Sequence, residues 1–130
     1  MTAHAIYITA SDAEKLRNLI WKAQSTEYRH STYLQMLAGE LARAVIVEQD
    51  AVLPDVITMN AQVSLLDVDT NEEMLYTLVF PEDADALQDK ISILAPIGTA
   101  MLGYRVGDEF EWDTPGSKRK IRVKKIAFKP

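Results

Sequence analysis

A chain of 130 residues with 48% hydrophobic and 25% charged residues has the size and composition of one ordinary domain, or of one small domain with an appendage. No apolar run approaches the roughly 18 residues of a membrane span, and the first residues lack the basic region and long apolar core of a signal peptide. The absence of cysteine fits a reducing compartment. We therefore expect a cytoplasmic protein.

The net charge of −5 is unevenly distributed along the chain. Residues 117–130 contain seven Lys and Arg and no acid, so residues 1–116 carry a net charge of −12. The acidic majority argues against general affinity for nucleic acid, because phosphate contacts need clustered cations. Two interpretations of the basic final strand stay open: a weak local contact with nucleic acid, or lysines that protect an edge strand from aggregation.

Two amphipathic helices are predicted in the first 50 residues, after a short extended segment at residues 6–9. Ser11 and Glu14 have the spacing of a capping box, and the apolar residues that follow predict a first helix over about 12–25. Apolar periodicity resumes over 34–45. The two stripes predict an antiparallel hairpin, a short coiled coil, with arms of about 15–17 residues or roughly 22–26 Å.

The hairpin is expected to form its own unit. Its tip falls in the polar segment near Glu27 to His30, and the helical period breaks again before Pro54. Because the residue before proline avoids the helical region, the break marks a boundary between a hairpin at 1–50 and a second domain at 51–130.

Strand signals replace helical ones in the second domain. One long or bulged strand is predicted over 56–66, a turn over 67–71 and a return strand over 73–80. Proline 81 ends this hairpin, and the acidic loop over 82–89 is expected only to interact with solvent. The overall class is therefore α+β, with a twisted antiparallel sheet.

The segment 91–114 predicts a short strand, one helical turn and a further strand. Pro96 suits the first turn of a helix, and Gly103 suits its end. Val106, Phe110 and Trp112 would share one face of the strand that follows. A helix this short cannot stand alone, so we expect it to plug the open side of the sheet.

The last strand, over 118–128, folds back through a type II turn with Pro115 and Gly116 at its centre. Ile121 and Val123 have one parity along this strand, whereas Ile126 and Phe128 have the other. A flat strand cannot bury all four, so a bulge or twist is predicted near 124–125.

No residue pattern in the chain predicts catalysis. Gly98 and Gly103 have phosphate-loop spacing without the Lys-Ser/Thr that would contact phosphate and magnesium. His4 and His30 have no second ligand at zinc-binding spacing. We therefore predict no catalytic residue, metal or cofactor.

Two acidic pairs have a second interpretation. Glu72 with Glu73, and Asp108 with Glu109, could in principle chelate a metal or act as acid and base. Neighbouring carboxylates in a turn or on a strand more often face water, which is the interpretation we favour.

The second domain resembles the C-terminal domain of the GreA and GreB transcript cleavage factors, in which this region reads Ser-Pro-Ile, then Leu-Leu-Gly and Val-Gly-Asp. Ala95 stands in place of the serine. The segments 56–60, 77–81 and 95–98 are more similar to a short-armed branch of that family, the regulators of nucleoside diphosphate kinase (Rnk). The matching positions are Pro96, Ile97, Leu102, Gly103, Val106, Gly107 and Asp108.

The resemblance implies an FKBP-like C-terminal domain that docks at the rim of the secondary channel of RNA polymerase, with the helical arm pointing into the channel. It also implies a docking surface at the turn that begins the short helix. In the alternative interpretation, Ile97 and Leu102 are simply core residues. The proposed contact residues are Ala95, Pro96, Ile97, Gly98, Met101 and Leu102.

The arm departs from the cleavage factors, which carry an acidic cluster at the tip of a long arm. Here the arm is short, and its tip, Glu27, Tyr28, Arg29 and His30, has one carboxylate beside cations. We therefore expect a non-enzymatic regulator that occupies the channel entrance and competes with GreA and GreB.

Two other functions stay open. The first is a residual transcript cleavage factor. The second is a peptidyl-prolyl isomerase, since FKBP-like domains include such enzymes with aromatic-lined pockets. The aromatic residues available are Tyr76, Phe80, Tyr104, Phe110, Trp112 and Phe128.

Overall fold

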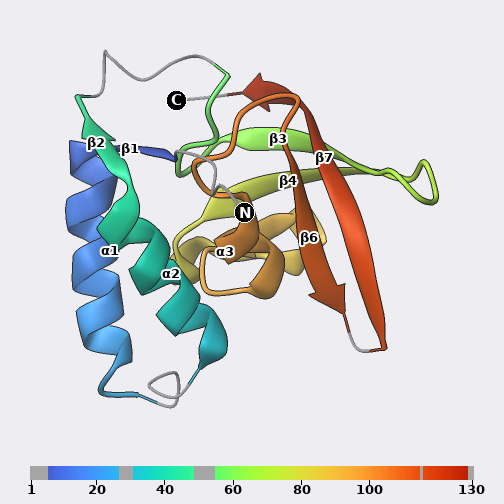
Figure 1. Cartoon of the computed structure of the whole chain (residues 1–130). Coiled ribbons are helices and arrows are strands. Elements are labelled where there is room, and N and C mark those ends of the chain that lie inside the picture. Colours follow the sequence, from blue (N-terminus) through green and yellow to red (C-terminus); the bar gives the residue numbers. More distant parts are fainter. Residues whose placement is uncertain (1–5, 27–30, 49–54, 115, 129–130) are drawn as a thin grey trace.

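A computed structural model describes residues 6–26, 31–48, 55–114 and 116–128 of the protein. Two long helices, α1 (Ala10–Ala23) and α2 (Thr32–Arg43), lie along one side, and a curled sheet forms the other side (Figure 1). The short helix α3 (Pro96–Met101) lies between them. The α+β class is confirmed. In the described part of the chain, no helix has the length and apolarity needed to cross a membrane.

The two helices are shorter than predicted, with 14 and 12 residues, or roughly 21 and 18 Å at 1.5 Å per residue. The predicted capping box at Ser11 and Glu14 is wrong. The first helix begins earlier, and the Thr9 hydroxyl oxygen accepts from the Asp12 N–H at 3.1 Å. Thr9 therefore supplies the cap, two residues before the expected one.

A parallel pair of short strands joins the two ends of the hairpin. These are β1 (Tyr7–Thr9) and β2 (Val45–Val47), paired in register with Ile8 opposite Ile46. The helical periodicity wrongly extended the second helix to residue 45. Ala44 is already extended, and the β-branched residues that follow favour a strand.

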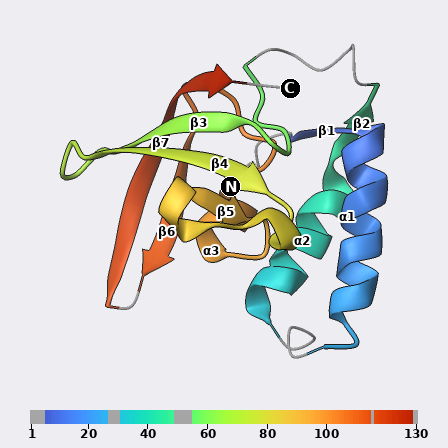
Figure 2. The same ribbon diagram turned by 180° about the vertical axis from the view of Figure 1, so that it is seen from behind.

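Five strands form the main sheet in the order β5-β4-β3-β7-β6. All neighbours are antiparallel except β4 and β5, which are parallel. Figure 2 shows the sheet from behind, where it curls around α3. The strands are β3 (Gln62–Asp67), β4 (Glu73–Val79), β5 (Lys90–Ser92), β6 (Glu109–Thr114) and β7 (Ser117–Phe128).

Of the strand predicted over 56–66, the second half is confirmed as β3 and the first half is wrong. Val56 forms an isolated bridge with Arg105, and Asn60 has a φ of 68°. A left-handed residue cannot continue an extended strand, so β3 begins only after this turn. The segment before it instead contacts the chain that follows α3, through the hydrogen bond from Ile57 N–H to the Tyr104 carbonyl at 2.8 Å.

The bulge predicted near 124–125 is confirmed. The pairing of β7 with β3 shifts register between Ser64 and Leu65, which leaves Lys124 without an opposite residue. The extra residue changes the parity of the strand. Val123 is fully buried and Ile126 packs against the same core. The bulge therefore lets residues of both parities face the core from one strand.

The third helix begins at Pro96 and is followed by Gly103 with a φ of 82°, as predicted. Its core side chains, Ile97 and Met101, are at most 4% exposed, and the helix packs against both β6 and α2. The prediction for Val106 is wrong. This residue precedes β6 and is 38% exposed, because the chain turns at 105–108 before the strand begins.

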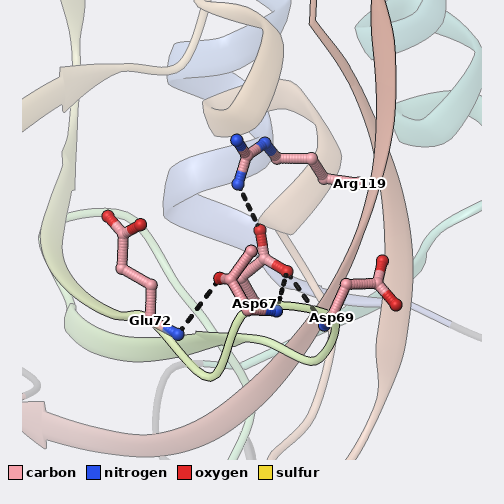
Figure 3. Close-up of polar contacts among 5 residues, drawn as sticks. Asp67, Asp69, Glu72 and Arg119 are labelled. Carbon is pink, nitrogen blue, oxygen red and sulfur yellow. Dashed lines mark hydrogen bonds and ion pairs between the residues drawn. The ribbon is translucent and has the colours of Figure 1, made fainter.

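One carboxylate ties the β3–β4 turn to β7 (Figure 3). Asp67 is 1% exposed, and its carboxylate accepts from the N–H groups of Asp69 at 3.0 Å and Thr70 at 3.3 Å, and from Arg119 Nη1 at 2.5 Å. The bond from Arg119 is the main reason that the pKa of Asp67 lies below its ordinary value, against the opposing effect of burial. The ionised form therefore stabilises the turn.

Two glycines allow a direct test of this packing. A Cβ atom at Gly98 would overlap the carbonyl oxygen of Ser92, whereas one at Gly39 would meet nothing within 4 Å. Gly98→Ala should therefore cost about 1–3 kcal/mol of unfolding free energy, and Gly39→Ala should add about 0.5–1 kcal/mol in the middle of α2. Urea unfolding measures both. If both substitutions changed the unfolding free energy equally, the close approach of α3 to Ser92 would be contradicted.

Asp67→Asn should lower the urea midpoint at pH 7, because Arg119 loses a charged acceptor. A lowered carboxyl pKa stabilises the fold above the unfolded-state value of about 3.9, and the effect is lost as pH falls through the folded-state pKa. The midpoints of wild type and variant should therefore converge as the pH falls below the lowered pKa of Asp67. Asp69→Asn, at an exposed carboxylate in the same turn, is the control and should change little.

Candidate functional site

The turn that begins α3 is the predicted docking surface, and the structure divides its residues into two groups. Ile97, Met101 and Leu102 are at most 4% exposed, and Gly98 is buried as well. These four therefore lie in the core, which agrees with the alternative interpretation for Ile97 and Leu102. Ala95, the residue before the helix, is only half-buried and makes no side-chain cap.

A short network holds this turn in one conformation. The buried Thr99 hydroxyl donates to the Ile93 carbonyl at 2.7 Å, and the Ser92 hydroxyl oxygen accepts from the Leu94 N–H at 3.0 Å. The Ala95 N–H donates to the Ser92 carbonyl at 2.9 Å. The backbone at the start of α3 is thus held in one conformation by hydrogen bonds within the segment 92–99.

The predicted tip residues, Glu27 to His30, lie outside the described residues, as does His4. The chain is described on both sides of the tip. Thr26 donates from its hydroxyl to the Ala23 carbonyl at 2.7 Å, and the Ser31 hydroxyl oxygen accepts from the Leu34 N–H at 3.4 Å. The hairpin therefore has a defined stop on α1 and a defined cap on α2.

Five cations of β7 are paired with carboxylates on β3, β4 and β6. Glu109 accepts from Arg122 at 2.7 Å, and this bond is the main reason that the pKa of Glu109 is lowered. Lys124 lowers the pKa of Glu73 in the same way. Such pairs leave little free positive charge for phosphate contacts. The ion pairs are Lys118–Glu111, Arg119–Asp67, Lys120–Glu109, Arg122–Glu109 and Lys124–Glu73.

The two acidic pairs do not converge on a common point. Glu73 contacts Lys124, and the Asp108 carboxylate accepts from the Arg105 N–H at 2.9 Å. Across residues 6–26, 31–48, 55–114 and 116–128, no three His, Asp or Glu side chains gather as a metal would require. The acids of the sheet therefore serve hydrogen bonds and ion pairs.

The aromatic residues do not line a common pocket within the described chain. Tyr104 and Phe110 contact each other in the core with ring centroids 5.6 Å apart, and burial raises the pKa of Tyr104. Tyr76 and Trp112 are half-buried at other places on the sheet. The arrangement does not provide the aromatic cavity of a prolyl isomerase.

Sequence reasoning missed an apolar groove on the outer face of the hairpin. It has a volume of about 410 Å³ and runs between α1 and α2, lined by Trp21, Ala42 and Ile46, with Arg17 at its polar side. Trp21 is 72% exposed. The available signal was a tryptophan off the apolar stripe of its helix, since contiguous exposed apolar surface often marks a contact.

A second cleft, with charged residues on both sides, lies between α1 and the loop after β4. Its volume is about 470 Å³, and Lys15 and Lys22 on the helix face Glu82 and Asp83 across it. Among the described residues, no ion pair joins these cations to these acids. The hairpin and the sheet are therefore separated along this part of α1.

Comparison with known proteins identifies both parts of the chain. Residues 51–128 match the family model for the C-terminal part of the GreA/GreB transcription elongation factors, and residues 4–47 match the Rnk N-terminus. The regulator of nucleoside diphosphate kinase from Escherichia coli K12 is 30% identical over 131 residues, which cover 100% of this chain and 94% of that protein. GreA from Geobacillus kaustophilus is 38% identical over 90 residues, which are 69% of this chain and 57% of that protein.

Solved structures agree with these matches. A GreA/GreB elongation factor from Nitrosomonas europaea is 38% identical, with a TM-score of 0.80 over 95% of this chain and 99% of that chain. GreA factor homolog 1 from Thermus thermophilus is 28% identical, with a TM-score of 0.52 over 96% of this chain and 100% of that chain. The protein therefore belongs to the GreA/GreB family of transcription elongation factors, within the group that carries the Rnk N-terminus.

Proposed function

We propose that this chain is a transcription regulator that binds RNA polymerase at the entrance of the secondary channel and does not promote transcript cleavage. Family membership supports the polymerase as partner. The observation that supports the absence of cleavage is the length of the hairpin, whose helices have only 14 and 12 residues. In this proposal the arm blocks the entrance and stops short of the catalytic metals.

The chemistry of cleavage supports the same conclusion. Two-metal hydrolysis needs carboxylates close enough to hold the second metal and its water. The tip sequence offers Glu27 alone, followed by Arg29 and His30. An arm that extends roughly 21 Å and carries one carboxylate beside cations does not provide such a ligand set. The protein therefore acts as a competitor and has no enzymatic activity of its own.

The domain division supports this role. We propose a hairpin module at 1–50 and an FKBP-like module at 51–130, with the boundary between the two regions that match separate family models. The hairpin is a short antiparallel coiled coil. Its buried seam includes Leu16 and Ile20 on α1 and Leu37 and Leu41 on α2.

The proposed docking surface is the start of α3. Ala95 and Pro96 make the contact, and the buried residues Ile97, Met101 and Leu102 support it from the core. Gly98 belongs to the support, because it lets the helix approach Ser92 closely. The basic strand is not a second docking surface in this proposal, because five of its cations form ion pairs with carboxylates.

Pro96→Asp tests this surface. Aspartate is tolerated in the first turn of a helix, so we expect a melting temperature close to that of wild type. Affinity for RNA polymerase should fall by about tenfold or more, equivalent to 1.4 kcal/mol, in a pull-down or biosensor assay. Ala86→Asp adds the same charge at an exposed position away from α3 and should bind normally. Wild-type affinity in Pro96→Asp would refute the assignment.

Backtracked elongation complexes test the absence of cleavage. Incubation with this protein alone should leave the transcripts at full length, and increasing amounts should slow the cleavage that added GreA stimulates. Electrophoresis of labelled RNA measures both effects. Shortened transcripts with this protein alone would establish it as a cleavage factor.

A further inference from the structure

We propose that Asp12 is a positioning residue that sets the direction of the hairpin relative to the sheet, together with a contact between Ile6 and Gly103. The consequence for polymerase rests on the function proposed above, whereas the positioning itself does not. The proposal concerns the N-terminal end of α1. Among the described residues, this is the end at which a side-chain hydrogen bond joins the helix to the second module.

The first contact is polar. Asp12 lies in the first turn of α1, and one of its carboxylate oxygens accepts from the Met59 N–H at 3.2 Å, 47 positions along the chain. Met59 is 2% exposed and precedes β3, so its N–H is outside the strand ladder. A buried N–H needs an acceptor, and the carboxylate provides one from the other module.

The second contact is apolar. Ile6 is fully buried, and a Cβ atom at Gly103 would lie 2.6 Å from the Ile6 Cβ. Gly103 also donates its N–H to the Ile57 carbonyl at 3.0 Å. The segment 57–59 is therefore held on one side by Gly103 and on the other side by Asp12, which links the start of α1 to the chain that follows α3.

These contacts fix the N-terminal end of α1, so a small rotation there displaces the other end of the helix. The far half of α1 faces the second cleft described above, where Lys22 has no ion pair to the acids opposite. The contact between α2 and α3 provides the pivot. For a helix of 14 residues, a rotation of about 10° at its start moves its end by roughly 3–4 Å. The contact of Asp12 therefore determines where the far end of α1 lies.

The experiment measures this direction with two spin labels. The chain has no cysteine, so Lys22→Cys and Lys125→Cys place labels only at the end of α1 and on β7. Asp12→Ala should shift or broaden the distance distribution by roughly 3–4 Å. Asp12→Asn keeps an acceptor and should restore the wild-type distribution. Asp12→Ser, whose hydroxyl is too short to contact Met59, replaces the alanine variant if that variant does not fold.

Ser31→Ala is the matched control. It removes the hydroxyl cap of the other helix of the hairpin and should lower the melting temperature without changing the distance distribution. The proposal is wrong if Asp12→Ala or Asp12→Ser gives the wild-type distribution, or if Asp12→Asn behaves like alanine, since the charge would then matter and the hydrogen bond would not.

Polymerase assays complete the test. The Asp12→Ala and Asp12→Ser variants should bind polymerase through α3 with wild-type affinity. They should no longer inhibit the cleavage that GreA stimulates. Retained inhibition despite an altered distribution would refute the link to function. If wild-type protein does not bind polymerase, the proposed function fails, while the distance measurements still decide the role of Asp12.

Discussion

The burial of α3 is the constraint on which the rest of the structure depends. A six-residue helix has too few internal hydrogen bonds to be stable alone, so its apolar side chains must supply the stability through tertiary contacts. Ile97 and Met101 do so by entering the core between the sheet and α2. Gly98 makes the approach close enough for this packing. The same burial leaves Ala95 before the helix and Ala100 within it only half-buried.

Local rules predicted the elements whose signals are contained in short segments. Pro96 and Gly103 marked the limits of α3, and the change of parity after Val123 indicated the bulge in β7. Both depend on geometry that neighbouring residues impose on one another. The resemblance to GreA and GreB added the family, which the comparisons confirm.

The misplaced elements depended on contacts with distant residues. Ile46 forms a strand because β1 lies beside it, and helical periodicity extends through Val45 without revealing this partner. Asn60 adopts a left-handed conformation in a run that otherwise favours strands. The same limit applies to the site. The sequence grouped Ile97 and Leu102 with the turn, and only the packed structure shows that both side chains are buried.

Trp21 has a consequence for optical studies of the protein. The chain contains two tryptophans, and Trp21 is 72% exposed on the hairpin whereas Trp112 is half-buried on the sheet. Their indole rings therefore experience different polarity, and the emission of the folded protein combines a water-quenched component with a shielded one. Replacing either ring with phenylalanine would make fluorescence a reporter of a single module.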